Sequence, residues 1–236
     1  MIGLIAAFII AMALSVMGTP LLIRFLVLHH YGQFIRQDGP TQHLTKRGTP
    51  TMGGVVIILA TVVAWLIGAL VAGAGPSWSG ILLAFLFVGL GTIGLLDDGI
   101  KIMRQRSLGL HPSGKIVGQV AVASLFAGGT LIRPNEFGEL AGTLEISFAR
   151  PTPLTLGFAG MAIGVILYLI WANLIVTAWS NATNLTDGLD GLAAGVSIFV
   201  FGAYTFIAYF QRIQACTQPD VNRAACYSTR DPLDLA

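Results

Sequence analysis

Long apolar segments alternate with short polar segments along the chain. Six of the apolar segments reach or approach the roughly 20 residues that a helix needs to cross the hydrocarbon core of a bilayer. They cover residues 2–28, 52–72, 78–96, 116–132, 158–179 and 192–210, and the fourth is the shortest. This pattern predicts an all-α integral membrane protein with about six transmembrane helices, forming one polytopic membrane domain over residues 1–236.

One polar connection carries a different pattern. In residues 139–148 the apolar side chains alternate with polar ones after the Ala141-Gly142 pair. Alternation next to a turn signal is typical of a β-strand. A short external β-hairpin is therefore predicted in this segment.

Composition agrees with a membrane protein and argues against a soluble one. Hydrophobic residues make up 55% of the chain and charged residues 10%, and the mean hydropathy is +0.78. A soluble domain carries about 25% charged residues. The net charge is only +2 and no run of five or more basic residues occurs, so we expect the bilayer, and no nucleic acid, as a partner.

Successive transmembrane helices alternate in direction, which assigns the connections to two sides. Segments 29–51, 97–115 and 180–191 share one side, and the N-terminus with segments 73–77, 133–157 and 211–236 shares the other. Counting Arg24 at the end of the first span, the first side carries eight of the 13 Lys and Arg residues. Short cytoplasmic loops favour these residues, so we expect the first side in the cytoplasm and both termini outside.

Two cysteines, Cys216 and Cys226, lie close together near the C-terminal end. Their spacing does not match a zinc site. Two alternatives remain open from the sequence: a pair of free thiols, or a disulfide if this segment lies outside the cell.

Adjacent carboxylates stand at the predicted end of the third span, where Asp97 and Asp98 precede Lys101. Such a pair at a membrane boundary is costly unless a cation lies nearby. Mg²⁺ prefers one or two carboxylates together with phosphate oxygens, and Lys101, one helical turn away, has the charge to bind a phosphate. The alternative is an ordinary solvated helix end.

A second polar cluster follows the predicted fifth span and contains Asn184, Asp187 and Asp190. A glycine follows each of the two aspartates, which favours a tight turn that presents oxygens and amides to a ligand. The alternative is an Asp-capped turn between two helices.

A third cluster, residues 38–54, leads into the second span and contains Asp38, His43, Lys46 and Thr51 among glycines and prolines. Free amides at a helix N-terminus favour anions, so this segment predicts phosphate binding. The alternative is a basic cytoplasmic loop. All three clusters fall on the predicted cytoplasmic side, which indicates one phosphate-handling, Mg²⁺-dependent transferase site.

The three segments 38–54, 95–101 and 181–193, with their order and spacing, resemble the phospho-N-acetylmuramoyl-pentapeptide transferases. These belong to the polyprenyl-phosphate N-acetylhexosamine-1-phosphate transferase superfamily. The resemblance implies transfer of phospho-MurNAc-pentapeptide from UDP-MurNAc-pentapeptide to undecaprenyl phosphate, which gives lipid I and UMP. It places the chain in the bacterial cytoplasmic membrane and in peptidoglycan synthesis, and thus in cell shape and division.

The resemblance also implies roles for residues. Asp97 and Asp98 are the catalytic acidic pair, with Asp97 as base toward the lipid phosphate, and Lys101 contacts the phosphates. The residues expected to bind the substrate are Asp38, His43, Lys46, Thr51, Asn184, Asp187 and Asp190. Asp97, Asp98 and Asp187 are the expected Mg²⁺ ligands in this chain, although Asp187 is also a candidate for orienting other ligands. A homodimer is a further expected assembly.

Members of this family have about ten spans, of which this chain supplies about the first six. Two family motifs are absent from it: a loop with the aspartate taken as the main Mg²⁺ ligand and a loop with clustered histidines. We therefore expect an N-terminal fragment or truncated product that is inactive alone. UMP release by the isolated 236-residue chain at a normal rate would contradict this.

Three alternatives differ in class. One is a related transferase that moves GlcNAc-1-phosphate to a polyprenyl carrier, which the long 38–54 segment argues against. Another is a transporter, whose carboxylates would lie at mid-membrane instead of at one boundary. The third is an inactive fragment that binds partner membrane proteins.

Overall fold

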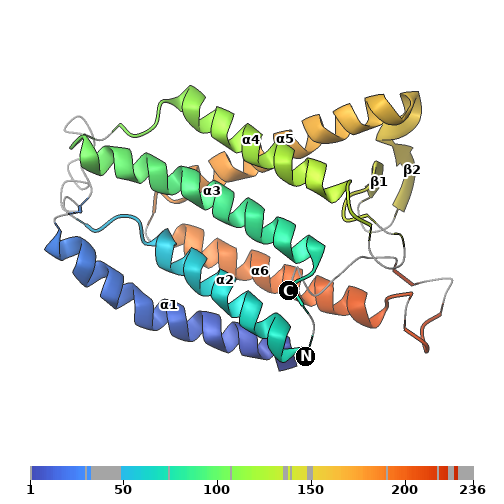
Figure 1. Ribbon diagram of the computed structural model, residues 1–236, viewed down its shortest axis with the longest axis horizontal. Helices are drawn as coiled ribbons and strands as arrows, with labels where there is room; N and C mark the ends of the chain where they lie inside the picture. Colours follow the sequence, from blue (N-terminus) through green and yellow to red (C-terminus); the bar gives the residue numbers. More distant parts are fainter. Residues whose placement is uncertain are drawn as a thin grey trace. The chain divides into compact units, whose positions relative to one another are not determined.

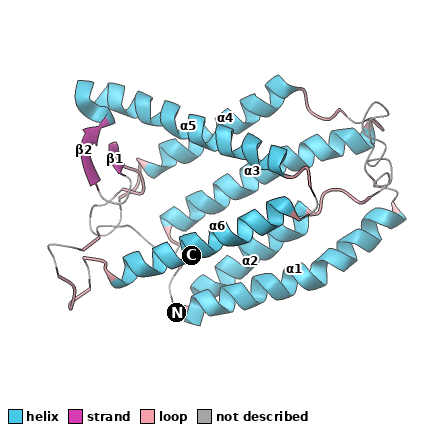
Figure 2. Ribbon diagram, turned by 180° about the vertical axis from the view of Figure 1, so that it is seen from behind, coloured by secondary structure: helices cyan, strands magenta, loops and turns pink. Residues whose placement is uncertain are grey.

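The computed structural model consists of six long α-helices and one two-stranded sheet among the residues it describes (Figures 1 and 2). Those residues are 2–29, 31–32, 49–73, 75–106, 108–134, 138, 140–147, 151–189, 191–216, 218–222 and 226–227. The elements are α1 (Ile2–Leu28), α2 (Gly54–Val71), α3 (Trp78–Met103), α4 (Pro112–Thr130), β1 (Glu145–Ser147), β2 (Pro151–Thr155), the 3₁₀ turn η2 (Leu156–Ala159), α5 (Met161–Thr186) and α6 (Leu192–Ile213).

Among the residues that the structure describes, five helices are long and apolar enough to cross a membrane: α1, α2, α3, α5 and α6. The helix predicted over 116–132 forms as α4, but it is not one of these five in the described part of the chain. Polar residues such as Lys115, Gln119 and Ser124 interrupt its apolar face. The integral membrane, all-α class is confirmed, and the described residues contain five strongly apolar spans where about six were predicted.

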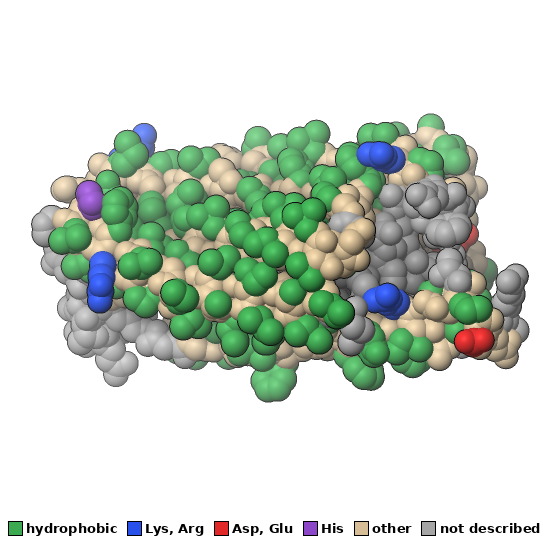
Figure 3. All heavy atoms as spheres, turned by 60° about the horizontal axis from the view of Figure 1, so that its bottom comes forward, with side chains coloured by type: hydrophobic (Ala, Val, Ile, Leu, Met, Phe, Trp, Pro, Cys, Tyr) green, Lys and Arg blue, Asp and Glu red, His purple; other side chains and the backbone are tan. Residues whose placement is uncertain are grey.

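Large apolar side chains are exposed along these helices. Phe199 of α6 is 81% exposed and Phe8 of α1 is 66% exposed. Figure 3 shows apolar side chains covering much of the visible surface of the helices. A water-soluble monomer rarely exposes so large an apolar surface, so this surface is suited to contact lipid.

The chain divides into two compact units, residues 1–76 with 86–119, and residues 77–85 with 120–236. In the first unit, α1 packs on α2 through small residues. A Cβ placed on Gly68 would lie 2.8 Å from both the Ala7 Cβ and the Gly3 carbonyl oxygen. The backbones of α1 and α2 therefore approach this closely only because Gly3 and Gly68 lack side chains.

Replacing Gly68 with alanine is expected to destabilise the protein by about 1–3 kcal/mol through overpacking. The added methyl group meets backbone, which yields less readily than a side chain. Gly94→Ala in α3 is the matched control, since no described atom lies within 4 Å of a Cβ there. Thermal unfolding in detergent should show a lower Tm for Gly68→Ala alone. Equal midpoints for the two variants would show that α1 and α2 do not pack as described.

In the second unit, polar pairs connect α4 with its neighbours. The Asn173 amide of α5 donates to Ser124 Oγ of α4 at 3.0 Å, and the Thr130 and Tyr168 hydroxyls are 2.8 Å apart. The Trp78 indole N–H donates to the Gly129 carbonyl at 3.0 Å. Lipid cannot form hydrogen bonds with buried polar groups, whereas neighbouring helices can. The polar side chains and carbonyls of α4, the least apolar helix, are therefore paired with α3 and α5.

The predicted hairpin is confirmed in kind and corrected in position. β1 follows the Ala141-Gly142 pair as expected, but its antiparallel partner is β2, with Glu145 opposite Thr155 and Ser147 opposite Pro151. The pairing therefore extends beyond the predicted segment 139–148. The residues that connect the two strands, 148–150, lie outside the described part of the chain.

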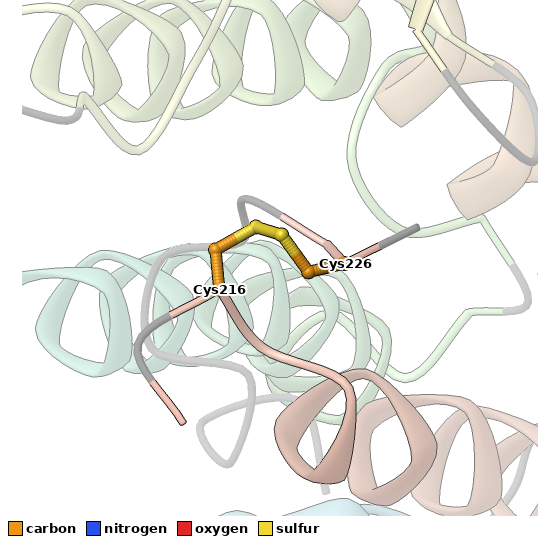
Figure 4. Close-up of a disulfide and its surroundings, with 2 residues drawn as sticks. All are labelled: Cys216 and Cys226. Atoms are coloured by element: carbon orange, nitrogen blue, oxygen red, sulfur yellow. A yellow bond between two sulfur atoms is a disulfide. The ribbon is translucent and has the colours of Figure 1, made fainter. Parts of the chain in front are cut away.

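Cys216 and Cys226 form a disulfide just after α6 (Figure 4). Their Cα atoms are 5.0 Å apart. Backbone hydrogen bonds support the same turn, with the Cys216 N–H donating to the Tyr227 carbonyl at 3.0 Å and the Tyr227 N–H to the Gln214 carbonyl at 2.9 Å. The structure thus decides between the two alternatives that the sequence left open.

Removing this disulfide by a Cys216→Ser/Cys226→Ser double substitution is expected to cost about 3 kcal/mol, because the cross-link closes a short loop and restricts the unfolded chain. The cysteines are 10 positions apart. Reductant should lower the Tm of the wild type and leave that of the double variant unchanged. A wild-type Tm insensitive to reductant, at full reduction, would contradict the prediction.

Candidate functional site

The third span extends further than its apolar residues predicted. It was expected to end at residue 96, but α3 continues to Met103, so Asp97, Asp98 and Lys101 are helical. From Trp78 to Asp97 the helix rises by about 28 Å at about 1.5 Å per residue. That is close to the roughly 30 Å thickness of a hydrocarbon core. The acidic pair is therefore expected near the point where α3 leaves the hydrocarbon core.

Lys101 bridges the two carboxylates. Its ammonium Nζ lies 2.7 Å from Asp97 Oδ2 and 2.9 Å from Asp98 Oδ1. The spacings of four and three residues place all three side chains on one helical face. The Asp97 side chain is 17% exposed, and those of Asp98 and Lys101 are 34% exposed. The cluster is therefore partly exposed, and the one positive charge of Lys101 neutralises one of the two carboxylates.

The connection between α3 and α4 returns to the same cluster. The Leu110 backbone N–H donates to Asp97 Oδ1 at 2.8 Å, so each carboxylate oxygen of Asp97 has its own donor. The preceding residue, Gly109, lies directly against Asp97. A Cβ on Gly109 would be 2.6 Å from the Asp97 carbonyl oxygen and 2.8 Å from its Cγ.

The end of the 38–54 segment also reaches α3. A Cβ on Gly99 would lie 3.7 Å from Met52 Cε, so the residues before α2 contact the helix next to the acidic pair. Met52 has φ 68°, a left-handed conformation that is unusual for a long side chain. The Thr51 hydroxyl is buried and has no hydrogen-bond partner among the described residues. Strain and an unsatisfied buried group are features that gather at functional sites.

The second polar cluster is part helix and part turn, and the predicted turn follows the helix at residues 187–189. α5 extends to Thr186, so residues 181–186 are helical and Asn184 lies in the last turn. The polar side chains do not end the helix, because they bond to its own carbonyls: Asn181 Nδ2 donates to the Thr177 oxygen at 2.8 Å and Thr186 Oγ1 to the Ala182 oxygen at 2.9 Å. Such bonding to the residue four positions earlier is compatible with a helix.

Asp187 is the C-cap of α5, and the left-handed Gly191 (φ 80°) then leads into α6. Asn184 and Asp187 are both exposed. They belong to the second compact unit, whereas Asp97, Asp98, Lys101 and Thr51 belong to the first. The other predicted site residues lie outside the described part of the chain; they are Asp38, His43, Lys46 and Asp190.

The donor set of the first unit fits Mg²⁺ in part. Asp97 and Asp98 supply two carboxylates, which is the number that Mg²⁺ commonly takes from protein when substrate phosphates and waters complete its shell. Within the described residues no group of three or more His, Cys, Asp or Glu side chains could hold a metal ion. Two carboxylates alone leave most of the coordination shell of such an ion to other ligands.

Two participants were missed from the sequence, namely Gly109 and the backbone amide of Leu110. An amide is common to all residues except proline, so it leaves no mark in the sequence. Gly109 is one of 29 glycines, and its only local signal is its place in the short connection before His111-Pro112. No spacing rule connects it with Asp97.

The chain matches two protein-family models. The model for "Glycosyl transferase family 4" matches residues 78–222, and the "Phospho-N-acetylmuramoyl-pentapeptide-transferase signature 1" matches residues 46–58. The first range contains the two polar segments 95–101 and 181–193, and the signature begins at Lys46 and contains Thr51.

Several relatives carry the name phospho-N-acetylmuramoyl-pentapeptide-transferase. The protein from Beutenbergia cavernae is 54% identical over 236 residues, which cover 100% of this chain and 66% of the relative. That from Micrococcus luteus is 53% identical over 243 residues, covering 100% and 64%, and that from Streptomyces griseus 47% identical over 229 residues, covering 96% and 62%. The chain thus spans slightly less than two thirds of their length. It belongs to glycosyl transferase family 4 and, within that family, carries the first signature of the phospho-N-acetylmuramoyl-pentapeptide-transferases.

Proposed function

We propose that the whole protein transfers phospho-MurNAc-pentapeptide from UDP-MurNAc-pentapeptide to undecaprenyl phosphate in peptidoglycan synthesis. An oxygen of the lipid phosphate attacks the sugar-linked phosphorus of the donor. The bond from that phosphorus to the bridging oxygen breaks, and UMP leaves with this oxygen, so that lipid I forms. The observation that carries the proposal is the Lys101-bridged pair Asp97 and Asp98 in a chain 54% identical to a protein of this name.

The described residues support a positioning mechanism. Phosphoryl transfer depends chiefly on alignment and on neutralising charge. Asp97, held by two donors, is suited to act as base toward the lipid phosphate, and Lys101 to contact the phosphates. Asp97 and Asp98 would hold Mg²⁺, with Asp187 as a further ligand. The ion would supply positive charge to the phosphate oxygens.

The nucleotide part of the donor is assigned to the remaining polar residues. The Thr51 hydroxyl, which is buried and has no hydrogen-bond partner among the described residues, is suited to a hydrogen bond with substrate. The other residues proposed to bind the substrate are Asp38, His43, Lys46, Asn184, Asp187 and Asp190. Thr51 is the strongest of these assignments, because leaving a buried hydroxyl unpaired costs free energy that a bound donor would recover.

We further infer that the site faces the cytoplasm and that both ends of this chain lie outside, in a protein that assembles as a homodimer. The disulfide Cys216–Cys226 supports this orientation, because disulfides persist in oxidising compartments. It lies after α6, at the opposite end of that helix from Asp187 and Gly191.

The test uses the purified product of the complete gene with undecaprenyl phosphate and Mg²⁺. UDP-MurNAc-pentapeptide should yield UMP and lipid I, whereas UDP-GlcNAc should yield neither. Turnover with UDP-GlcNAc alone would favour the related GlcNAc-1-phosphate transferase instead.

Removing divalent cations with EDTA is expected to abolish UMP release, and added Mg²⁺ to restore it. The reason is that two carboxylates and one ammonium leave the site with net negative charge, which repels a diphosphate substrate. Undiminished UMP release in EDTA would contradict the assignment of Asp97 and Asp98 as metal ligands. A monovalent salt at equal ionic strength is the control.

A further inference from the structure

The carboxylate of Asp97 is held from two directions. Lys101 Nζ lies 2.7 Å from Oδ2, and the Leu110 N–H lies 2.8 Å from Oδ1. Lys101 belongs to the same helix, so its contact follows from helical spacing alone. Leu110 is 13 positions away and reaches Asp97 only because the chain folds back after α3.

The return of the chain begins with a defined helix end. Gln105 has φ 48°, its N–H donates to the Ile102 carbonyl at 3.2 Å, and the Arg106 N–H donates to the Lys101 carbonyl at 3.1 Å. This pair of bonds around a left-handed residue is the Schellman motif, which ends a helix and reverses the chain.

The far side of the connection is also fixed. His111 Nδ1 is 2.7 Å from Ser113 Oγ, and the Lys115 N–H donates to the His111 carbonyl at 3.1 Å as α4 begins. Between these two anchored ends, Gly109 and Leu110 pass against Asp97. The contact is therefore set by the geometry of both helix ends.

Gly109 is the residue that the close passage requires. Its φ is not among the left-handed values of the described residues, so backbone conformation does not explain a glycine. Space does, since a Cβ would meet Asp97 Oδ1 and lie 2.6 Å from the Asp97 carbonyl oxygen. That carbonyl belongs to the backbone of α3 and has little freedom to move. A larger residue must push the connection away from α3. The hydrogen bond from the Leu110 N–H to Asp97 Oδ1 then becomes longer.

We infer that Gly109 is a positioning residue for the proposed transferase reaction. By lacking a side chain it lets the Leu110 amide hold Asp97 Oδ1, which sets the plane of the carboxylate before substrate binds. A base held in its reactive orientation avoids reorganisation during the reaction. The catalytic consequence rests on the proposed function, whereas the contact itself does not.

The first test compares Gly109→Ala with Gly114→Ala in the complete protein. A Cβ on Gly114 would make an ordinary 3.7 Å contact with Leu110 Cδ2, so this variant changes the same region without displacing Asp97. We expect kcat to fall about 10–100-fold for Gly109→Ala, as misplacement by about 1 Å can cause, with KM for the donor within about twofold. Gly114→Ala should match wild type. Wild-type kcat in Gly109→Ala would overturn the inference.

The second test separates the amide from the side chain of Leu110. Leu110→Pro removes the N–H, whereas Leu110→Ala keeps it and shortens the side chain. The inference expects a loss of kcat in Leu110→Pro alone. Equal losses in both variants would assign the effect to side-chain packing and would overturn it.

A third measurement is independent of turnover. Hydrogen exchange of the Leu110 amide should be slow in the wild type and fast in Asp97→Ala. Slow exchange in both would overturn the inference even in an active enzyme. Slow exchange that Asp97→Ala abolishes, in a wild type without transferase activity, would support the contact and contradict the proposed function.

Discussion

Replacement of Asp97 by asparagine is expected to lower turnover by about 10²–10⁴-fold, the range associated with loss of a general base. Asparagine has nearly the same shape, and its oxygen is still able to accept the Leu110 N–H. The substitution removes the negative charge that Lys101 contacts at 2.7 Å and the capacity to take a proton from the lipid phosphate. Expression and donor binding should stay close to those of the wild type.

The measurement is UMP release under saturating donor and acceptor, together with donor affinity by titration. Asp220→Asn is the matched control, because Asp220 is an exposed carboxylate in a turn after α6. It should retain wild-type turnover. Near-normal turnover in Asp97→Asn would refute the role of Asp97, whereas equal losses in both variants would indicate a general effect of lost charge.

Replacement of Lys101 by methionine is expected to reduce kcat/KM by about 10²–10³-fold, comparable with loss of one preorganised electrostatic donor. Lys101 is 2.7 Å from Asp97 and 2.9 Å from Asp98. Without its ammonium the adjacent carboxylates repel each other and any incoming phosphate. Methionine preserves most of the length of the side chain, so helix packing should change little.

Lys101→Arg separates charge from geometry. Arginine keeps the positive charge but has a planar group that does not reproduce a point contact to two oxygens. We expect its kcat/KM to lie between those of Lys101→Met and the wild type. Arg212→Gln near the end of α6 removes a cation elsewhere and should leave turnover unchanged. Wild-type kcat/KM in Lys101→Met would remove Lys101 from the site.

The helices could be predicted because each apolar segment carries its own signal. Their ends could not, since that signal stops where polar residues begin. At α3 the helix continues through Asp97 and Asp98 because Lys101 stands three and four positions later and pairs with both. At α5 the helix continues because Asn181 and Thr186 bond to its carbonyls. Both extensions depend on polar side chains, and a hydropathy pattern treats such residues as the end of a span.

The candidate site was also predictable from the sequence only in part. The grouping of Asp97, Asp98 and Lys101 follows from helical spacing, which a sequence displays directly. The contact of Leu110 with Asp97 depends on how the chain reverses at Gln105 and restarts at His111, and no local pattern encodes that path. The partner of β1 was likewise misplaced, because the alternation within one strand does not tell which later segment pairs with it.

The disulfide after α6 has a practical consequence for labelling. Cys216 and Cys226 are the only two cysteines of the 236 residues, and both are consumed by one bond. A cysteine introduced at any exposed position of this chain is therefore its only reactive thiol under non-reducing conditions. A membrane-impermeant maleimide applied to intact cells should label a cysteine placed at Asp220 and should spare one placed at Asp187. Single cysteines introduced into this 236-residue chain can thus report its orientation while the native pair stays in the disulfide.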